Sequence, residues 1–101
     1  MNNKLVSYIG FSIKSNNCYF NKVLIEKNIN KVKLLIESSD ALNNTEKEAL
    51  NLSKKYNIKL IKLNDISIEE ITKKKNCKLI AISDNNLVEA ILNLKEDYKV
   101  L

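Results

Sequence analysis

The feature that most constrains the fold of this chain is a strand-to-helix transition that occurs twice. The apolar run at residues 32–36 is followed by a polar stretch and then by an amphipathic segment. The apolar run at residues 79–82 is likewise followed by Ser-Asp-Asn-Asn and a second amphipathic segment. Buried strands that alternate with helices are typical of small α/β sandwiches. The sequence therefore predicts an α/β fold, with largely parallel pairing among the strands at 32–36, 58–63 and 79–82.

Hydrophobic spacing and turn residues place the other elements along the chain. Extended segments are expected at residues 18–20, 32–36, 58–63 and 79–82. Helices are expected at residues 3–14, about 22–28, 45–56, a short stretch from residue 67, and about 85–98. Thr45 with Glu48 and Ser67 with Glu70 have the spacing of a capping box, and Asn21 is expected to cap the second helix.

The length of 101 residues suits one domain with one modest core, so residues 1–101 are expected to form a single domain. No stretch approaches the roughly 20 apolar residues that a membrane span needs. Polar residues interrupt the apolar runs near Met1, which argues against a signal peptide. We therefore expect a cytoplasmic protein.

The chain has no histidine and only two cysteines, Cys18 and Cys77, which lie far apart in the sequence. A zinc site needs more ligands than these, and a redox pair needs closely spaced cysteines. Two reduced, half-buried thiols are expected instead. Because the commonest general base is missing, we expect no enzymatic activity, and no metal or other cofactor.

The net charge is +5, and all 17 basic residues are lysine. Lysine attracts phosphate as a point charge but cannot form the bidentate contacts of a guanidinium group. The positive excess collects in two segments, which contain Lys14, Lys22, Lys27 and Lys31, and then Lys73, Lys74, Lys75 and Lys78. Lysines at a helix end can simply complement the helix dipole. Two basic segments on separate connections are better explained if they converge on one polyanion.

Several short motifs keep a joint order and spacing over almost the whole chain. They are Ile9-Gly10-Phe11-Ser12, Lys33-Leu34-Leu35-Ile36, Asp40-Ala41 with Asn44-Thr45, Tyr56-Asn57-Ile58 and Leu79-Ile80-Ala81-Ile82-Ser83-Asp84. With them, residues from about 4 to 95 resemble the kink-turn RNA-binding ribosomal protein family, called the L-seven-Ae type in archaea, and most of all its bacterial YlxQ-like subgroup. The resemblance implies a three-layer α/β/α sandwich with a mixed, roughly four-stranded sheet. It also implies a non-catalytic protein that binds structured RNA, such as ribosomal RNA.

Members of this family bind RNA with the start of the second helix and with the loop before the last strand. The matching segments here are residues 21–27 and 72–78. Because both coincide with the lysine-rich segments, charge and resemblance select the same RNA-binding candidates, namely Asn21, Lys22, Lys27, Lys73, Lys74, Lys75 and Lys78.

The chain departs from the family at the start of the second helix. Members that read kink-turns carry Gly-x-Asn-Glu there, whereas this chain has Asn21-Lys22-Val23-Leu24. Binding is therefore expected to rely on lysine–phosphate contacts rather than on readout of base edges. Core packing is the expected role of Val23 and Leu24.

Other side chains in these regions have two interpretations each. Tyr19 and Phe20 could stack on unpaired bases, although one ring of such a pair is more often in the core. Asp40 and Asn44 are expected to cap the helix that follows them rather than to take part in catalysis.

Two other classes of function stay open. A protein-interaction module that kept the fold but lost specific RNA binding is the main alternative, and the altered segment at residues 21–24 favours it. Its partners would be other proteins or the ribosome. A small α/β enzyme has the least support.

Overall fold

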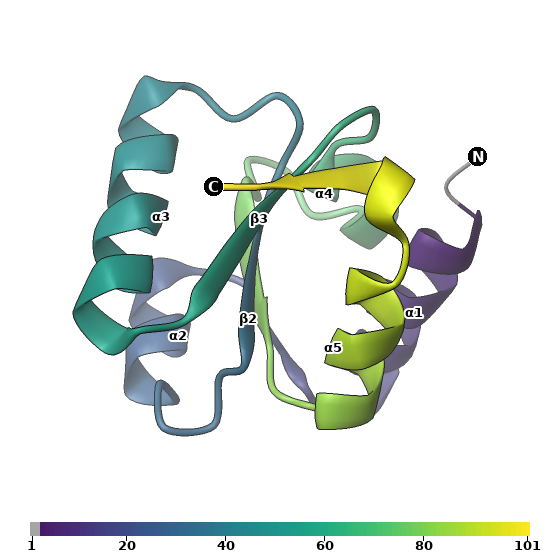
Figure 1. Cartoon of the computed structure of the whole chain (residues 1–101), viewed down its shortest axis with the longest axis horizontal. Coiled ribbons are helices and arrows are strands. Elements are labelled where there is room, and N and C mark those ends of the chain that lie inside the picture. The colour runs from purple at the N-terminus through teal and green to yellow at the C-terminus, as the bar shows by residue number, and fades with distance from the viewer. Residues whose placement is uncertain (1–2) are drawn as a thin grey trace.

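The computed structural model describes residues 3–101, which form helices on both faces of one sheet (Figure 1). The helices are α1 (Asn3–Lys14), α2 (Lys22–Lys27), α3 (Asn43–Tyr56), α4 (Ile68–Thr72) and α5 (Asn85–Leu92), and a 3₁₀ helix spans Lys95–Asp97. The strands are β1 (Cys18–Tyr19), β2 (Leu34–Glu37), β3 (Lys59–Leu63), β4 (Leu79–Ile82) and β5 (Tyr98–Val100). The predicted α/β fold is confirmed. None of the helices within residues 3–101 has the length and apolar character that a bilayer span requires.

The sheet is mixed, with the strand order β1-β4-β2-β3-β5. Strands β2 and β3 are parallel and joined by α3, as expected, whereas β4 is antiparallel to β2, with Leu35 opposite Ala81. The prediction of largely parallel pairing was therefore wrong for β4. The reason lies in α4, whose five residues span only about 7.5 Å. A helix this short does not carry the chain back across the sheet, so β4 starts at the end where β3 stops.

Each face of the sheet buries its own hydrophobic cluster, because successive strand residues point to opposite faces. On β2, Leu34 and Ile36 face the side covered by α1, α4 and α5, while Leu35 faces α2 and α3. Helix α1 contributes Leu5 and Ile9 to the first cluster, and both are fully buried. The layers of the sandwich therefore follow directly from the alternation along the central strands.

The helix starts confirm two of the three expected caps. Asn21 Oδ1 accepts a hydrogen bond from the Leu24 N–H at 2.9 Å, and Ser67 with Glu70 forms a complete capping box. The third expectation was wrong, because α3 begins at Asn43 and no side chain caps it. Thr45 lies inside the first turn instead, since the helix starts directly after a tight turn that ends at residue 41.

The end of the chain differs from the expected long helix. Helix α5 stops at Leu92, and Tyr98 opens β5, which pairs with β3 and gives the sheet five strands rather than the expected four. The Tyr98 hydroxyl donates a hydrogen bond to the Leu92 carbonyl, while its ring packs on the hydrophobic cluster beside α5. Leu94 and Tyr98 both pack against this cluster, and the pairing of β5 with β3 adds backbone hydrogen bonds that a continued helix would not form with the sheet.

Candidate nucleic-acid interface

The pairing of β1 with β4 brings the two lysine-rich segments together. Tyr19 on β1 pairs with Ala81 on β4, so the residues that lead into α2 lie beside the chain that enters β4. The thiol of Cys77 donates a hydrogen bond to the Phe20 carbonyl, with 3.5 Å between sulfur and oxygen. The start of α2 and the loop at residues 73–78 are therefore neighbours.

These two segments enclose an open cavity of about 320 Å³, which we call the α2–β4 cavity. It is lined by Phe20, Asn21, Leu24, Lys74, Lys75, Asn76 and Cys77. Among the predicted site residues, the cavity thus unites Asn21 with Lys74 and Lys75. The ammonium of Lys74 lies 4.5 Å from the centre of the Phe20 ring, within cation–π distance.

The loop that carries these lysines is held by its backbone. Lys73 and Asn76 adopt left-handed φ values of 64° and 62°, which are uncommon outside glycine. The Asn76 N–H donates to a carboxylate oxygen of Glu69 at 2.6 Å, and the Lys74 N–H donates to the Thr72 hydroxyl at 3.2 Å. Lys74 and Lys75 therefore project from a loop with a defined conformation.

Lys78 closes the loop through ion pairs. Its ammonium lies 2.8 Å from the Asp40 carboxylate and also contacts Glu69. Hydrogen bonds to Asp40 and then to Glu69 raise the pKa of Lys78, and the hydrogen bond from Lys78 lowers the pKa of each carboxyl group. Among the seven predicted site residues, Lys78 is thus the one whose charge is already compensated.

Two expected helix-capping roles are wrong. Asp40 accepts a hydrogen bond from the Ser38 hydroxyl and pairs with Lys78 instead of capping α3. Asn44 lies within the first turn of α3, which has no side-chain cap. The chain reverses direction between β2 and α3, and this turn directs the Asp40 carboxylate toward the loop before β4.

The remaining predicted residues do not line the α2–β4 cavity. Lys22 lines a separate hollow between α2 and α3, together with Glu26 and Lys55. Lys27 is exposed in the last turn of α2, and Lys73 is exposed at the end of α4. These three lysines therefore lie on α2 and at the end of α4, outside the cavity.

Core packing of Val23 and Leu24 was predicted and is wrong. Val23 is 74% exposed and Leu24 is 39% exposed, and Leu24 lines the cavity. Helix α2 is so short that it buries only Ile25 against the sheet. The start of α2 consequently presents apolar side chains to solvent.

The two neighbouring aromatic rings are shared between the faces of the sheet. Tyr19 packs against the cluster under α2 and α3, and Phe20 packs against the cluster on the opposite face. Both side chains are half-buried, so neither ring lies wholly in the core, whereas one of the two was expected to. Only Phe20 borders the α2–β4 cavity among these two rings.

Both thiols are buried more fully than expected, and neither forms a disulfide. Burial raises the pKa of Cys18 to about 12 and also raises the pKa of Cys77. The thiols are therefore protonated at neutral pH and weakly nucleophilic. Across residues 3–101, no three side chains of the metal-binding types come together.

Sequence reasoning missed three cavity residues, Leu24, Asn76 and Cys77, and the carboxylates that hold the loop. Asparagine is one of the few residues besides glycine that readily adopts a left-handed conformation, so its position in a short loop could have pointed to Asn76. No sequence signal predicts that Glu69 and Asp40 share Lys78, because that contact depends on how β2 and β4 are paired.

Comparison with known proteins finds the same fold in a solved structure. A protein of unknown function from Bacillus halodurans superimposes with a TM-score of 0.77 and 22% sequence identity. The match covers 93% of this chain and 98% of the other. No family model and no curated protein matches the chain. At this level of identity the likeness establishes the fold alone.

Proposed function

We propose that this chain is a non-catalytic, cytoplasmic RNA-binding protein of the kink-turn ribosomal protein family, similar to its YlxQ-like subgroup. It docks on structured RNA mainly through contacts between lysine and phosphate. The observation that supports this most is the α2–β4 cavity, where Lys74 and Lys75 face Asn21. The family resemblance assigns RNA contacts to the same two segments.

The local charge also favours an anionic ligand. Lys73, Lys74 and Lys75 follow one another on the loop and form no ion pair with a carboxylate of residues 3–101. The nearby carboxylates of Asp40 and Glu69 are engaged by Lys78 instead. A net positive field therefore remains at the cavity, which suits a phosphate backbone.

The side chains at the start of α2 indicate how the RNA would be held. The Asn21 side-chain oxygen is used by the cap, so its amide group remains free to donate to a phosphate or a base. Val23 and Leu24 offer no hydrogen bond to a base edge. We therefore expect binding by charge and shape, with little discrimination between an intact kink-turn and one that lacks its G·A pairs.

Binding to a kink-turn hairpin and to a plain duplex at several salt concentrations tests this proposal. If about four lysines engage phosphates, log affinity should fall against log salt with a slope of about −3 to −4. The double variant Lys74→Ala/Lys75→Ala should flatten the slope by about two units on both RNAs. The matched control is Lys47→Ala/Lys95→Ala, which removes two exposed lysines flanked by Glu46, Glu48 and Glu96.

Two results would contradict the proposal. One is the absence of measurable binding to either RNA at low salt. The other is a loss of affinity in the control that equals the loss in Lys74→Ala/Lys75→Ala. A strong and salt-insensitive preference for the intact kink-turn would instead contradict the lysine–phosphate mode.

A protein-interaction module is the second candidate, and the exposed Val23 favours it. An apolar side chain that is 74% exposed beside the cavity suits a protein contact better than a phosphate contact. In this case a protein partner should stay bound after nuclease treatment, and Val23→Ser should release it. Loss of the partner with unchanged RNA affinity would favour this alternative.

A further inference from the structure

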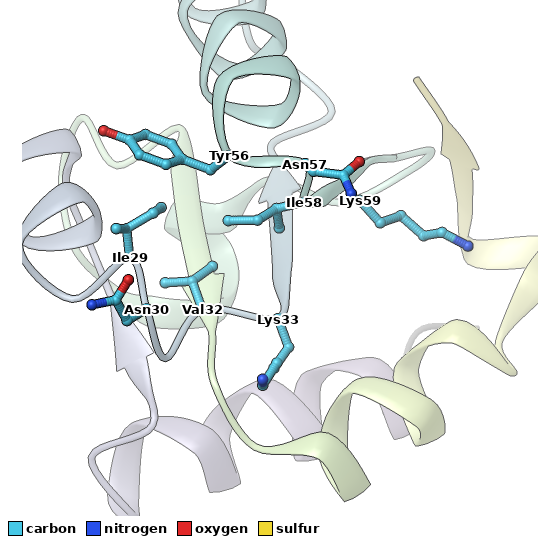
Figure 2. A pocket seen from close by; sticks show the side chains of 8 residues that line it. All are labelled: Ile29, Asn30, Val32, Lys33, Tyr56, Asn57, Ile58 and Lys59. Atoms are coloured by element: carbon cyan, nitrogen blue, oxygen red, sulfur yellow. The ribbon is translucent and has the colours of Figure 1, made fainter.

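A second group of lysines lies at the opposite end of the sheet from the α2–β4 cavity. An open hollow of about 400 Å³ separates the connection before β2 from the connection before β3 (Figure 2). It is lined by Ile29, Asn30, Val32, Lys33, Tyr56, Asn57, Ile58 and Lys59. Because β4 is antiparallel to β2, the chain enters β4 at one end of the sheet and β2 at the other.

The charges at this hollow are not compensated. Within residues 3–101 the ion pairs involve only Lys62 and Lys78, so Lys33 and Lys59 have no carboxylate partner. Both side chains are exposed, and Figure 2 shows them extending away from the hollow. The nearby carboxylate of Glu26 accepts a hydrogen bond from the Tyr56 hydroxyl at 3.3 Å.

The helix dipole explains some lysines here but not these two. Lys54 and Lys55 occupy the last turn of α3, where a positive charge stabilises the helix. Lys33 directly precedes β2, and Lys59 opens β3. Strands have only small dipoles, so the position of Lys33 and Lys59 in the fold gives them no such role.

The geometry favours an extended anion over a small one. A small anion would need donors that converge on one point, whereas Lys33 and Lys59 diverge around the rim. The exposed amides of Asn30 and Asn57 line the same rim and can donate to phosphate or ribose oxygens. Such an open, spread arrangement fits the repeating charge of a nucleic-acid backbone.

Helix α2 connects the two lysine groups. It starts at the α2–β4 cavity and ends toward the connection that enters β2, and its six residues span about 9 Å. Lys27 is exposed in its last turn, and Lys31 is exposed between the helix and Lys33. Exposed lysines therefore follow the chain from one end of the sheet to the other.

We propose that the surface around Lys33 and Lys59 is a second RNA-backbone contact, so that one RNA stem spans both ends of the sheet along α2. This inference rests on the proposed RNA-binding function and adds the length of the substrate. The longest dimension of the molecule is 32 Å. This is the upper limit for the distance between the two contacts. It corresponds to about ten base pairs at the B-form DNA rise of about 3.4 Å per pair, and to slightly more in A-form RNA, whose rise is shorter.

Two hairpins and two pairs of double variants test this inference. A stem of about 12 base pairs reaches both ends of the sheet, whereas a stem of about 4 base pairs reaches only one. Lys33→Ala/Lys59→Ala should flatten the salt slope by about two units on the long stem and leave the short stem unchanged. Lys74→Ala/Lys75→Ala should weaken binding to both stems, and Lys47→Ala/Lys95→Ala is the charge-matched control. Thermal melting of each variant checks that the fold is intact.

The outcomes separate the two proposals. If Lys33→Ala/Lys59→Ala binds the long stem as the control does, while Lys74→Ala/Lys75→Ala is impaired, the second contact is refuted and the proposed function stands. If neither variant differs from the control, the proposed function fails as well. The wild type and Lys33→Ala/Lys59→Ala are also tested for binding to anionic lipid vesicles. If the variant loses vesicle binding but keeps the RNA affinity of the control, the surface serves a membrane and the inference is overturned.

Discussion

Two lysine–carboxylate clusters flank the carboxyl end of β2, and they use the same groups in different surroundings. In the loop cluster, Lys78 contacts Asp40 and Glu69, whose side chains are 48% and 31% exposed. Water reaches all three groups. The hydrogen bond from Lys78 lowers the pKa of both carboxyl groups, so the cluster is charged throughout the neutral range.

In the sheet cluster, Lys62 on β3 lies 3.1 Å from Glu46 and 3.6 Å from Glu37. The Glu37 side chain is completely buried, and neither of its oxygens has a hydrogen-bond partner in the part of the chain that the structure describes. Burial, and then the neighbouring Glu46, raises the pKa of Glu37 to about 7 in spite of Lys62. A lysine partner therefore does not fix the charge of a carboxyl group, because desolvation can outweigh it.

Removing the lysine of the sheet cluster should have the largest effect on stability. Lys62→Met leaves the buried Glu37 carboxylate without a cation. Because Glu37 then protonates, the free energy of unfolding should fall by about 1.4 kcal/mol at about pH 8, one unit above its pKa of about 7. The cost should shrink at about pH 5, where Glu37 is protonated. Urea unfolding at both pH values measures it.

The matched substitution in the loop cluster is Lys78→Met. Because its carboxylate partners are exposed to water, the free energy of unfolding should change far less than in Lys62→Met. Equal destabilisation by the two substitutions would show that burial of Glu37 does not distinguish the clusters.

The pH dependence of stability should identify Glu37 directly. Its pKa rises from 4.5 to about 7 on folding, so its contribution is fully present below about pH 4.5 and is lost as the pH rises through about 7. At 1.36 kcal/mol per unit, the free energy of unfolding should fall by at most about 3.4 kcal/mol over that range. The lowered pKa of Glu46 offsets part of this change.

The variant Glu37→Gln removes the titrating group and should flatten this part of the pH profile. At about pH 8 it should be at least as stable as the wild type, because no charge is left in the buried position. The measurement is chemical unfolding at several pH values between about 4 and 8. An unchanged profile in Glu37→Gln would assign the dependence to another group.

The sequence predicted the central strands well because their apolar runs are short and continuous. The limits of α1 and the Ser67–Glu70 capping box follow from local patterns and were also predicted correctly. The antiparallel β4 and the extra strand β5 were not, because pairing direction and the burial of Tyr98 depend on contacts between distant segments. Long-range pairing leaves little trace in a local pattern.

The site was predictable in charge but not in shape. Consecutive lysines and a family resemblance selected Lys74 and Lys75, and the structure places both on one cavity. The pairing of Lys78 with Asp40 and Glu69 was not foreseen, since those residues are brought together by the alignment of β2 with β4. The exposure of Val23 was not foreseen either, because apolar residues on a helix are usually buried.

The smallest expected effect concerns RNA affinity and again compares the two clusters. Glu69→Gln removes a negative charge beside the α2–β4 cavity but keeps an oxygen that can accept from the Asn76 N–H. RNA affinity at about 0.15 M salt, where the Debye length is about 8 Å, should therefore rise roughly twofold. Glu46→Gln removes the same charge in the sheet cluster. The α2–β4 cavity lies beside β1, whereas Glu46 pairs with Lys62 on β3. These two strands are three positions apart in the sheet, about 14 Å, so screening should leave RNA affinity unchanged in Glu46→Gln. Titration of both variants with one hairpin decides the matter, and an equal rise in both would mean that net charge rather than the α2–β4 cavity governs binding.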